Sequence, residues 1–154
     1  MQDSISQRLL QRVAEAEPIR SKLRELKGRS GQVRFSHVTE AAQSLLVAAL
    51  ASEIPRTLWI VCPTVRTQET FYETLLNWQS DALFLPEAEF AAVENILPDP
   101  EITAERLALL SRILSERGPH IIVVTRASLD QPAHRLRALK SAALRIKKGS
   151  NQTM

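Results

Sequence analysis

Apolar and polar residues change their spacing along this chain, and the change divides it into segments. Near the start, apolar residues recur every three or four positions, as in amphipathic helices, in two stripes made of Ile5, Leu9, Val13 and of Ile19, Leu23, Leu26. Pro18 separates the stripes and suits the first turn of a new helix. Residues 1–28 are therefore predicted to form an N-terminal helical segment with two helices.

After residue 28, short apolar runs alternate with helical patterns. We predict helices over 40–51, 65–79 and 99–117, and strands at Gln32–His37, Thr57–Cys62, Ala82–Leu85 and Ile121–Val124. Thr64 and Asp99 are expected to cap the second and third of these helices. The third helix is expected to have an inward face of Ile102, Leu107, Leu110 and Leu114 and a solvent face of Arg106, Arg112 and Arg117. The second and fourth strands are almost entirely apolar, as strands buried on both faces of a parallel sheet are. The alternation predicts an α/β domain over residues 29–141, with right-handed crossovers and helices on both faces of a parallel sheet. The first, second and fourth strands are expected at its centre.

The loop before the helix at 40–51 has the spacing of a phosphate-binding loop but lacks its residues. That motif reads G-x-x-x-x-G-K-[ST] between a strand and a helix. With Ser44 at the hydroxyl position, His37 and Ala42 replace the two glycines and Gln43 replaces the lysine. Glu40 adds a negative charge where phosphates would lie. We therefore predict a nucleotide-binding architecture with a degenerate phosphate loop and no bound cofactor.

Other residues with useful chemistry form no catalytic pattern. The three histidines, His37, His120 and His134, are far apart and have no ligand-spaced partners, so no metal site is expected. Three acids between Pro86 and Pro98, namely Glu87, Glu89 and Glu94, could form an acid/base pair, but a solvated loop explains them better. Cys62 lies in an apolar run and is expected to be buried and inert. The two tryptophans, Trp59 and Trp78, are expected in the core.

Composition is that of an ordinary globular protein. The chain has 154 residues, of which 44% are hydrophobic and 24% charged. It has neither an apolar run of about 20 residues, which a membrane helix needs, nor a secretory signal pattern. With a single cysteine, these features predict a cytoplasmic protein.

Positive charge is concentrated at the end of the chain. The net charge is +3, yet from Arg126 onward seven cations face Asp130 alone, so the preceding part is acidic. Such a tail could make weak contacts with nucleic acid, although a solvated surface is the commoner role. Ala142–Lys148 has the pattern of a strand that leaves the domain. We therefore expect residues 142–154 to begin a following domain of a longer protein.

Three segments in order carry a resemblance to a known family. They are Phe84–Phe90 (FLPEAEF), Asp99–Leu110 (DPEITAERLALL) and Ile121–Leu129 (IIVVTRASL). They resemble the N-terminal, UvrB-like region of the bacterial transcription-repair coupling factor Mfd, where a strand ends in a proline-containing turn. A helix with R-L-x-x-L and a strand with I-V-V-T-x-x-x-L follow. Val38–Ser44 falls where UvrB has a working phosphate loop and the coupling factor has a degenerate one.

The resemblance implies a part in transcription-coupled nucleotide excision repair. The parent would be an ATP-dependent DNA translocase that displaces stalled RNA polymerase and recruits UvrA. This chain would be its non-catalytic scaffold, a three-layer RecA-like domain with a degenerate phosphate loop. The UvrA, RNA polymerase and DNA contacts would lie in adjoining domains. Two alternatives stay open: an active nucleotide-dependent helicase domain with an unorthodox loop, and a free-standing nucleic-acid adapter with a basic C-terminal arm. Glu40 and Gln43 argue against the first.

Overall fold

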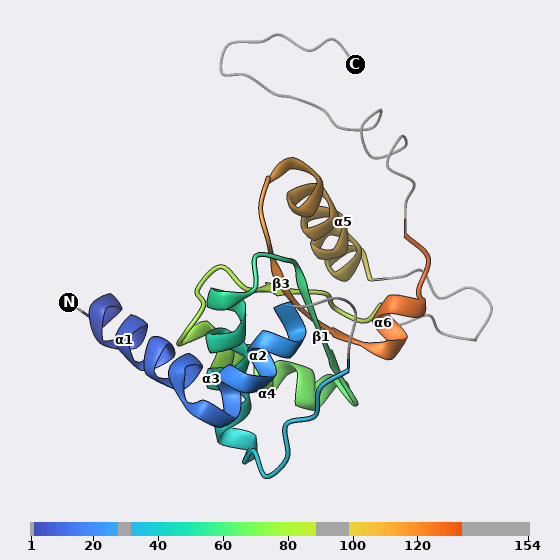
Figure 1. Cartoon of the computed structure of the whole chain (residues 1–154). Helices are drawn as coiled ribbons and strands as arrows, with labels where there is room; N and C mark the ends of the chain where they lie inside the picture. Colours follow the sequence, from blue (N-terminus) through green and yellow to red (C-terminus); the bar gives the residue numbers. More distant parts are fainter. Residues whose placement is uncertain (1, 28–31, 89–98, 134–154) are drawn as a thin grey trace, which may run out of the picture.

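The computed structural model describes residues 2–27, 32–88 and 99–133, and these residues form a small parallel sheet with helices around it (Figure 1). The elements in chain order are α1 (Gln2–Glu15), α2 (Glu17–Lys27), α3 (Glu40–Glu53), β1 (Leu58–Cys62), α4 (Val65–Leu76), β2 (Leu83–Phe84), α5 (Pro100–Ser115), β3 (Ile121–Thr125) and α6 (Arg126–Asp130). The predicted α/β class is confirmed.

The sheet has three strands in the order β1-β3-β2, and both pairings are parallel. The last strand in the chain therefore lies in the middle. Leu58 pairs with Ile121 and Cys62 with Thr125 on one side, while Phe84 pairs with Val123 on the other. The predicted parallel arrangement of the Thr57–Cys62 and Ile121–Val124 strands is confirmed.

One face of the sheet carries the larger core. Ile121, Val123 and Cys62 pack there against buried residues of the four helices α1 to α4, namely Leu10, Ala14, Leu23, Ala48, Ala49 and Leu75. The N-terminal helices belong to this layer, because α1 packs along α3 and contributes Leu10 and Ala14 to the core. Alanines at 48 and 49 let the neighbouring helices approach α3 closely.

The other face of the sheet is covered by α5 over part of its width. Ile122 and Val124 pack there with Leu83, Leu85 and Leu109, and Ile113 adds to the cluster. Since α4 and α5 lie on opposite faces, β1 reaches β2 over one face and β2 returns to β3 over the other. This reversal agrees with the rule that crossovers between parallel strands are right-handed.

Two helix starts follow the predicted local chemistry. The Thr64 hydroxyl accepts a hydrogen bond from the Thr67 amide at 3.1 Å, and α4 begins at the next residue. Asp99 caps α5 through the Glu101 amide at 2.8 Å, with Pro100 in the first turn. A side-chain oxygen satisfies an amide that the helix leaves free, and proline has no amide to satisfy.

The strand predicted at Gln32–His37 is absent, and this prediction was wrong. Residues 32–36 pair with no described strand, and His37 has a positive φ of 60°. Only Val33 and Phe35 are apolar in this segment, and both stay partly exposed. A strand needs a neighbour for its backbone groups, and the described sheet consists of β1, β3 and β2 without this segment.

Two side-chain predictions also fail. Trp59 was expected in the core, but 48% of its surface is exposed because α5 does not extend over β1. Leu114 was expected to face inward with Ile102, Leu107 and Leu110, yet it is 47% exposed, and Leu109 is the buried residue of α5. Trp78 packs against the larger core, as predicted, and Cys62 is buried.

Several predictions fall outside the described residues. They concern most of the acidic loop, with Glu89 and Glu94, the basic tail beyond residue 133, and the strand pattern at Ala142–Lys148. Within the described part, no helix is long and apolar enough to cross a membrane.

Adjacent leucines at the end of α4 test the assignment of the core. Leu75 is fully buried and Leu76 is 36% exposed. Leu75→Ala is expected to lower the free energy of unfolding by about 2–5 kcal/mol, because it leaves a cavity in the larger core. Leu76→Ala, the matched control, should cost under about 1 kcal/mol. Urea denaturation measures both, and equal effects would contradict the packing described above.

Candidate functional site

The predicted phosphate-loop residues lie at the start of α3, but they do not form a phosphate cradle. His37 and Gln43 are exposed, Ala42 is half-buried, and Glu40 stands exposed in the first turn of the helix. Ser44, which would supply the metal-binding hydroxyl, is only 2% exposed and faces the core. A hydroxyl buried in this way is not open to a magnesium ion or a triphosphate.

The backbone before α3 also differs from that of a phosphate loop. Thr39 precedes the helix in an extended conformation, and its side chain makes no capping hydrogen bond. The carboxylate of Glu40 lies beside the positive end of the helix dipole, where it stabilises the helix and repels an anion. No described strand leads into this turn.

The carboxyl ends of the strands are the usual ligand-binding edge of an open parallel sheet. Here Gln68 of α4 occupies that edge and is completely buried. Its Nε2 donates to the carbonyl oxygens of Leu85 at 2.8 Å and Val123 at 3.0 Å. Gln68 therefore ties β3 to the segment after β2. Its Oε1 is buried with no hydrogen-bond partner among the described residues.

The turn after β3 is closed by a reciprocal cap. The Thr125 hydroxyl accepts from the Ser128 amide at 2.9 Å, and the Ser128 hydroxyl accepts from the Thr125 amide at 3.0 Å. The Thr125 hydroxyl also donates to Glu87 Oε2 at 3.1 Å. Glu87 was predicted as a solvated acid, but it is half-buried and belongs to this network.

Arg106 of α5 joins the two loops at this edge. Its Nη1 donates to the Pro86 carbonyl at 2.5 Å and its Nη2 to the Ser128 carbonyl at 3.3 Å. Burial lowers the pKa of Arg106, because desolvation disfavours its charge, yet a guanidinium stays protonated in proteins. Sequence reasoning placed Arg106 on the wet side of the helix, and that prediction was wrong.

Gln131, which follows the last residue of α6, forms hydrogen bonds to the backbone of the segment after β2. Its Nε2 donates to the Ala88 carbonyl at 2.7 Å, and its Oε1 accepts from the Ala88 amide at 2.9 Å. The side chain thus pairs with the backbone as a neighbouring strand would. Gln68, Glu87, Arg106 and Gln131 all form hydrogen bonds around β3 and the segments that follow β2 and β3, and we call these four residues the edge network.

Sequence reasoning gave no signal for Gln68 or Gln131, because an isolated glutamine in a helix or turn has no distinctive spacing. Of the three histidines, His37 is exposed, His120 is half-buried, and His134 lies outside the described residues. Burial raises the pKa of the Cys62 thiol, because desolvation disfavours the thiolate. In the described part of the chain, no three His, Cys, Asp or Glu side chains gather as a metal site would need.

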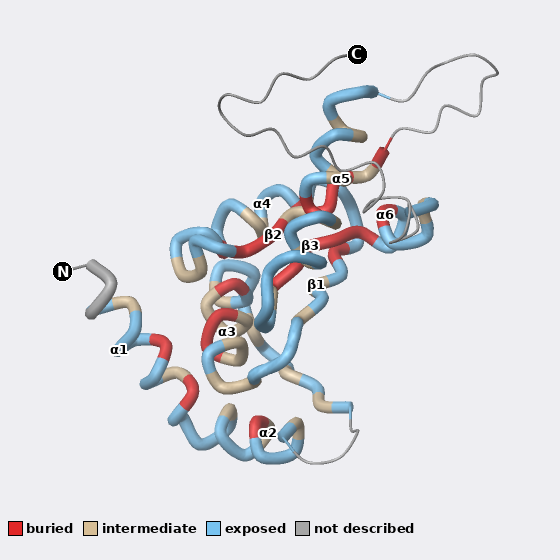
Figure 2. Tube along the Cα trace, turned by 90° about the horizontal axis from the view of Figure 1, so that it is seen from above, coloured by how far each residue is buried: buried red, intermediate tan, exposed pale blue. Residues whose placement is uncertain are grey.

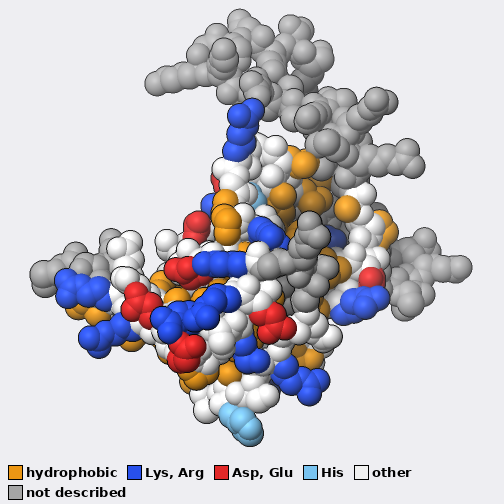
Figure 3. Space-filling view, in the orientation of Figure 1, with side chains coloured by type: hydrophobic (Ala, Val, Ile, Leu, Met, Phe, Trp, Pro, Cys, Tyr) orange, Lys and Arg blue, Asp and Glu red, His pale blue; other side chains and the backbone are white. Residues whose placement is uncertain are grey.

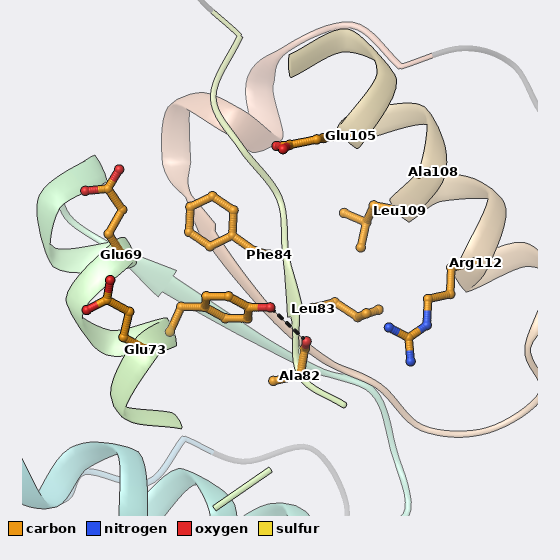
Figure 4. Close-up of a pocket in the computed structure, with 10 residues that line it drawn as sticks. Glu69, Glu73, Ala82, Leu83, Phe84, Glu105, Ala108, Leu109 and Arg112 are labelled. Carbon is orange, nitrogen blue, oxygen red and sulfur yellow. Dashed lines mark hydrogen bonds between the residues drawn. The ribbon is translucent and has the colours of Figure 1, made fainter. Parts of the chain in front are cut away.

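A hollow of about 620 Å³ lies beside β2 and is lined by residues of α4, β2 and α5 (Figure 4). Its apolar residues include Leu83 and Leu109, and the rings of Tyr72 and Phe84 meet there at an angle of 53° with centroids 5.1 Å apart. Its charged residues are Glu69, Glu73, Glu105 and Arg112. Among the described residues that line it there is no histidine, cysteine or serine.

Comparisons of the chain with family models, with curated proteins and with solved structures give no match in any of the three.

Removing the central amide of the edge network should destabilise the fold. Gln68→Leu leaves the carbonyls of Leu85 and Val123 without the Gln68 donor, at an expected cost of about 1–3 kcal/mol in the free energy of unfolding. Gln43→Leu is the control, because Gln43 is exposed on α3 and should cost under about 0.5 kcal/mol. Chemical denaturation compares them, and a neutral Gln68→Leu would show that the bridge is dispensable.

Proposed function

We propose that this chain is a non-catalytic scaffold module with a RecA-like, three-layer fold and a degenerate phosphate loop. It would serve a DNA-repair protein of the transcription-repair coupling factor kind. The observation that carries the proposal is the edge network, in which the chain's own side chains occupy the sheet edge that a nucleotide would need. A domain that seals this edge is suited to a structural role.

The phosphate-loop region supports the same conclusion. A triphosphate needs backbone amides, a cation and a free hydroxyl in one turn. This turn offers an acid at Glu40, an amide side chain at Gln43 and a buried hydroxyl at Ser44. Each departure removes a donor or a charge, so the loss of nucleotide binding does not depend on a single position.

The residues that carry the family resemblance also have a common place in the structure. Pro86 and Glu87 come from the first segment, Arg106 from the second, and Thr125 and Ser128 from the third. Arg106 and Thr125 connect them through hydrogen bonds to Pro86, Ser128 and Glu87. A common role in holding these loops together explains why these residue types occur at this spacing. It supports a relationship between this chain and the coupling-factor family in fold as well as in sequence.

The alternatives have less support. An active helicase domain would need a reachable nucleotide site, and the described residues offer neither a lysine in the loop nor an open sheet edge for it. A nucleic-acid adapter would need a basic surface. On α1 and α2, cations and acids are interspersed (Figure 3). Glu17 pairs with Arg20 and Arg24, and Lys27 pairs with Glu53.

In this proposal, the binding surfaces for UvrA, RNA polymerase and DNA lie outside this module. UvrA would bind an adjoining domain, while RNA polymerase and DNA would bind further domains of a cytoplasmic parent that hydrolyses ATP. This chain would contribute no cofactor site and no catalytic residue. The basic tail beyond residue 133 would make at most weak, salt-sensitive contacts with nucleic acid.

The chain is expected not to bind Mg-ATP measurably. Isothermal titration calorimetry is the test, and a dissociation constant at or below about 100 µM would overturn the proposal. The triple variant His37→Gly, Ala42→Gly, Gln43→Lys should also fail to bind, because the hydroxyl of Ser44 remains buried. Gain of tight binding by the variant alone would mean that only the loop residues, and not the fold, prevent binding.

The chain by itself is expected not to bind UvrA tightly, whereas a version extended through a following domain should bind it. Surface plasmon resonance against both versions is the measurement. Equal binding with sub-micromolar affinity by the 154-residue chain would place the UvrA surface within it. Absence of binding by both would contradict the proposed relationship.

A further inference from the structure

The outer edge of β2 has no neighbouring strand among the described residues. β2 lies at one end of the strand order β1-β3-β2, and β3, which is buried along its length, separates it from β1 (Figure 2). The Leu85 amide donates to the Val123 carbonyl of β3 at 3.0 Å. Successive residues of a strand direct their backbone groups to opposite sides, so the amide and carbonyl of Phe84 point away from β3. An edge of this kind can pair with a further strand.

The hollow beside β2 provides apolar surface along this edge. Residues of α4 line one side of it and residues of α5 the other, with β2 between them (Figure 4). On the α4 side lie the half-buried rings of Tyr72 and Phe84, and the Tyr72 hydroxyl donates to the Ala82 carbonyl at 3.4 Å. On the α5 side, Leu83 packs with Leu109. A segment that paired with β2 would therefore meet apolar side chains on both of its faces.

The rim of the hollow is acidic on both sides of β2. Glu69 and Glu73 of α4 and Glu105 of α5 are exposed, and no described cation forms an ion pair with them. Arg112 also lines the hollow, but its Nε donates to both carboxylate oxygens of Glu116, at 2.9 and 3.0 Å. The three unpaired carboxylates therefore give the hollow a net negative charge.

We propose that this hollow binds an extended, basic protein segment, which pairs with the outer edge of β2 as an additional strand. The side chains of an added strand alternate between the two faces of the sheet, so consecutive residues reach α4 and α5 in turn. Arginine or lysine suits both positions, because the stem lies on apolar surface while the charged end meets a carboxylate. On the α4 side, the rings of Tyr72 and Phe84 attract the cation as well.

The same charges disfavour other occupants of the hollow. Nucleic acid presents a row of phosphates, which the three carboxylates would repel. A second copy of this chain that paired along the same edge would bring two sets of these acids together. The inference rests on β2, α4 and α5 alone, so it does not depend on the proposed repair function.

The test is a titration of the full chain, at low salt, with the fluorescently labelled peptide acetyl-TVRRVRVT-amide, followed by anisotropy. Glu69→Gln with Glu73→Gln should weaken binding about fivefold, because two ion pairs are lost, and Glu105→Gln about twofold. The matched control, Glu15→Gln with Glu25→Gln, removes two exposed carboxylates of α1 and α2 outside the hollow and should leave the affinity unchanged. Circular dichroism of each variant confirms that the chain remains folded.

Two results of this titration would overturn the proposal. One is a dissociation constant above about 1 mM for the unmutated chain. The other is an equal loss of affinity in the hollow variants and the control, because the peptide would then respond only to the overall charge. The same peptide with glutamate in place of arginine should not bind, and binding as tight as that of the basic peptide would exclude the acidic rim as the determinant.

Hydrogen exchange measured by NMR tests the pairing with β2 separately. The Phe84 amide should exchange about tenfold more slowly when the basic peptide saturates the chain, because it then donates to the added strand. Bound peptide with unchanged exchange at Phe84 would overturn strand pairing. Protection of this amide that grows with protein concentration in the absence of peptide would also overturn the proposal, because a second copy of the chain would then occupy the edge.

Discussion

The fold depends on the burial of β3 on both faces while it pairs along both edges. All five of its residues, Ile121–Thr125, are buried. Ile121 and Val123 anchor the layer of α1 to α4, and Ile122 and Val124 anchor α5. Because β3 comes last in the chain among the three strands, β1 and β2 have no common partner until it is in place. Closing these long-range contacts is costly in chain entropy, and burial of the apolar strand offsets it.

The edge network satisfies backbone groups at the carboxyl edge of the sheet with side chains of the chain itself. Parallel strands end in loops with free backbone groups, which a bound phosphate or a side chain can satisfy. Here Gln68 and Gln131 supply amides, and Arg106 supplies a guanidinium, to carbonyls of the loops. These contacts make the carboxyl edge a part of the framework, and they are the structural basis for proposing a scaffold.

Some of this could be predicted from sequence and some could not. The apolar runs that became β1 and β3, and the caps at Thr64 and Asp99, are local signals that the structure confirms. The strand expected at Gln32–His37 failed because pairing depends on a neighbour that local pattern does not reveal. Arg106 was misplaced, since its position on the helix indicated solvent while a distant loop supplied its partners.

Native-state hydrogen exchange tests the central claim most directly. The claim is that burial of β3 stabilises the whole fold and that a nucleotide adds no stability to it. The amides of Ile122 and Val124 should exchange only through global unfolding, with the free energy found by denaturation. Mg-ATP should leave their protection, and that of residues around Ser44, unchanged. Exchange of β3 through a low-energy local opening, or a rise in protection around Ser44 on adding Mg-ATP, would contradict the account.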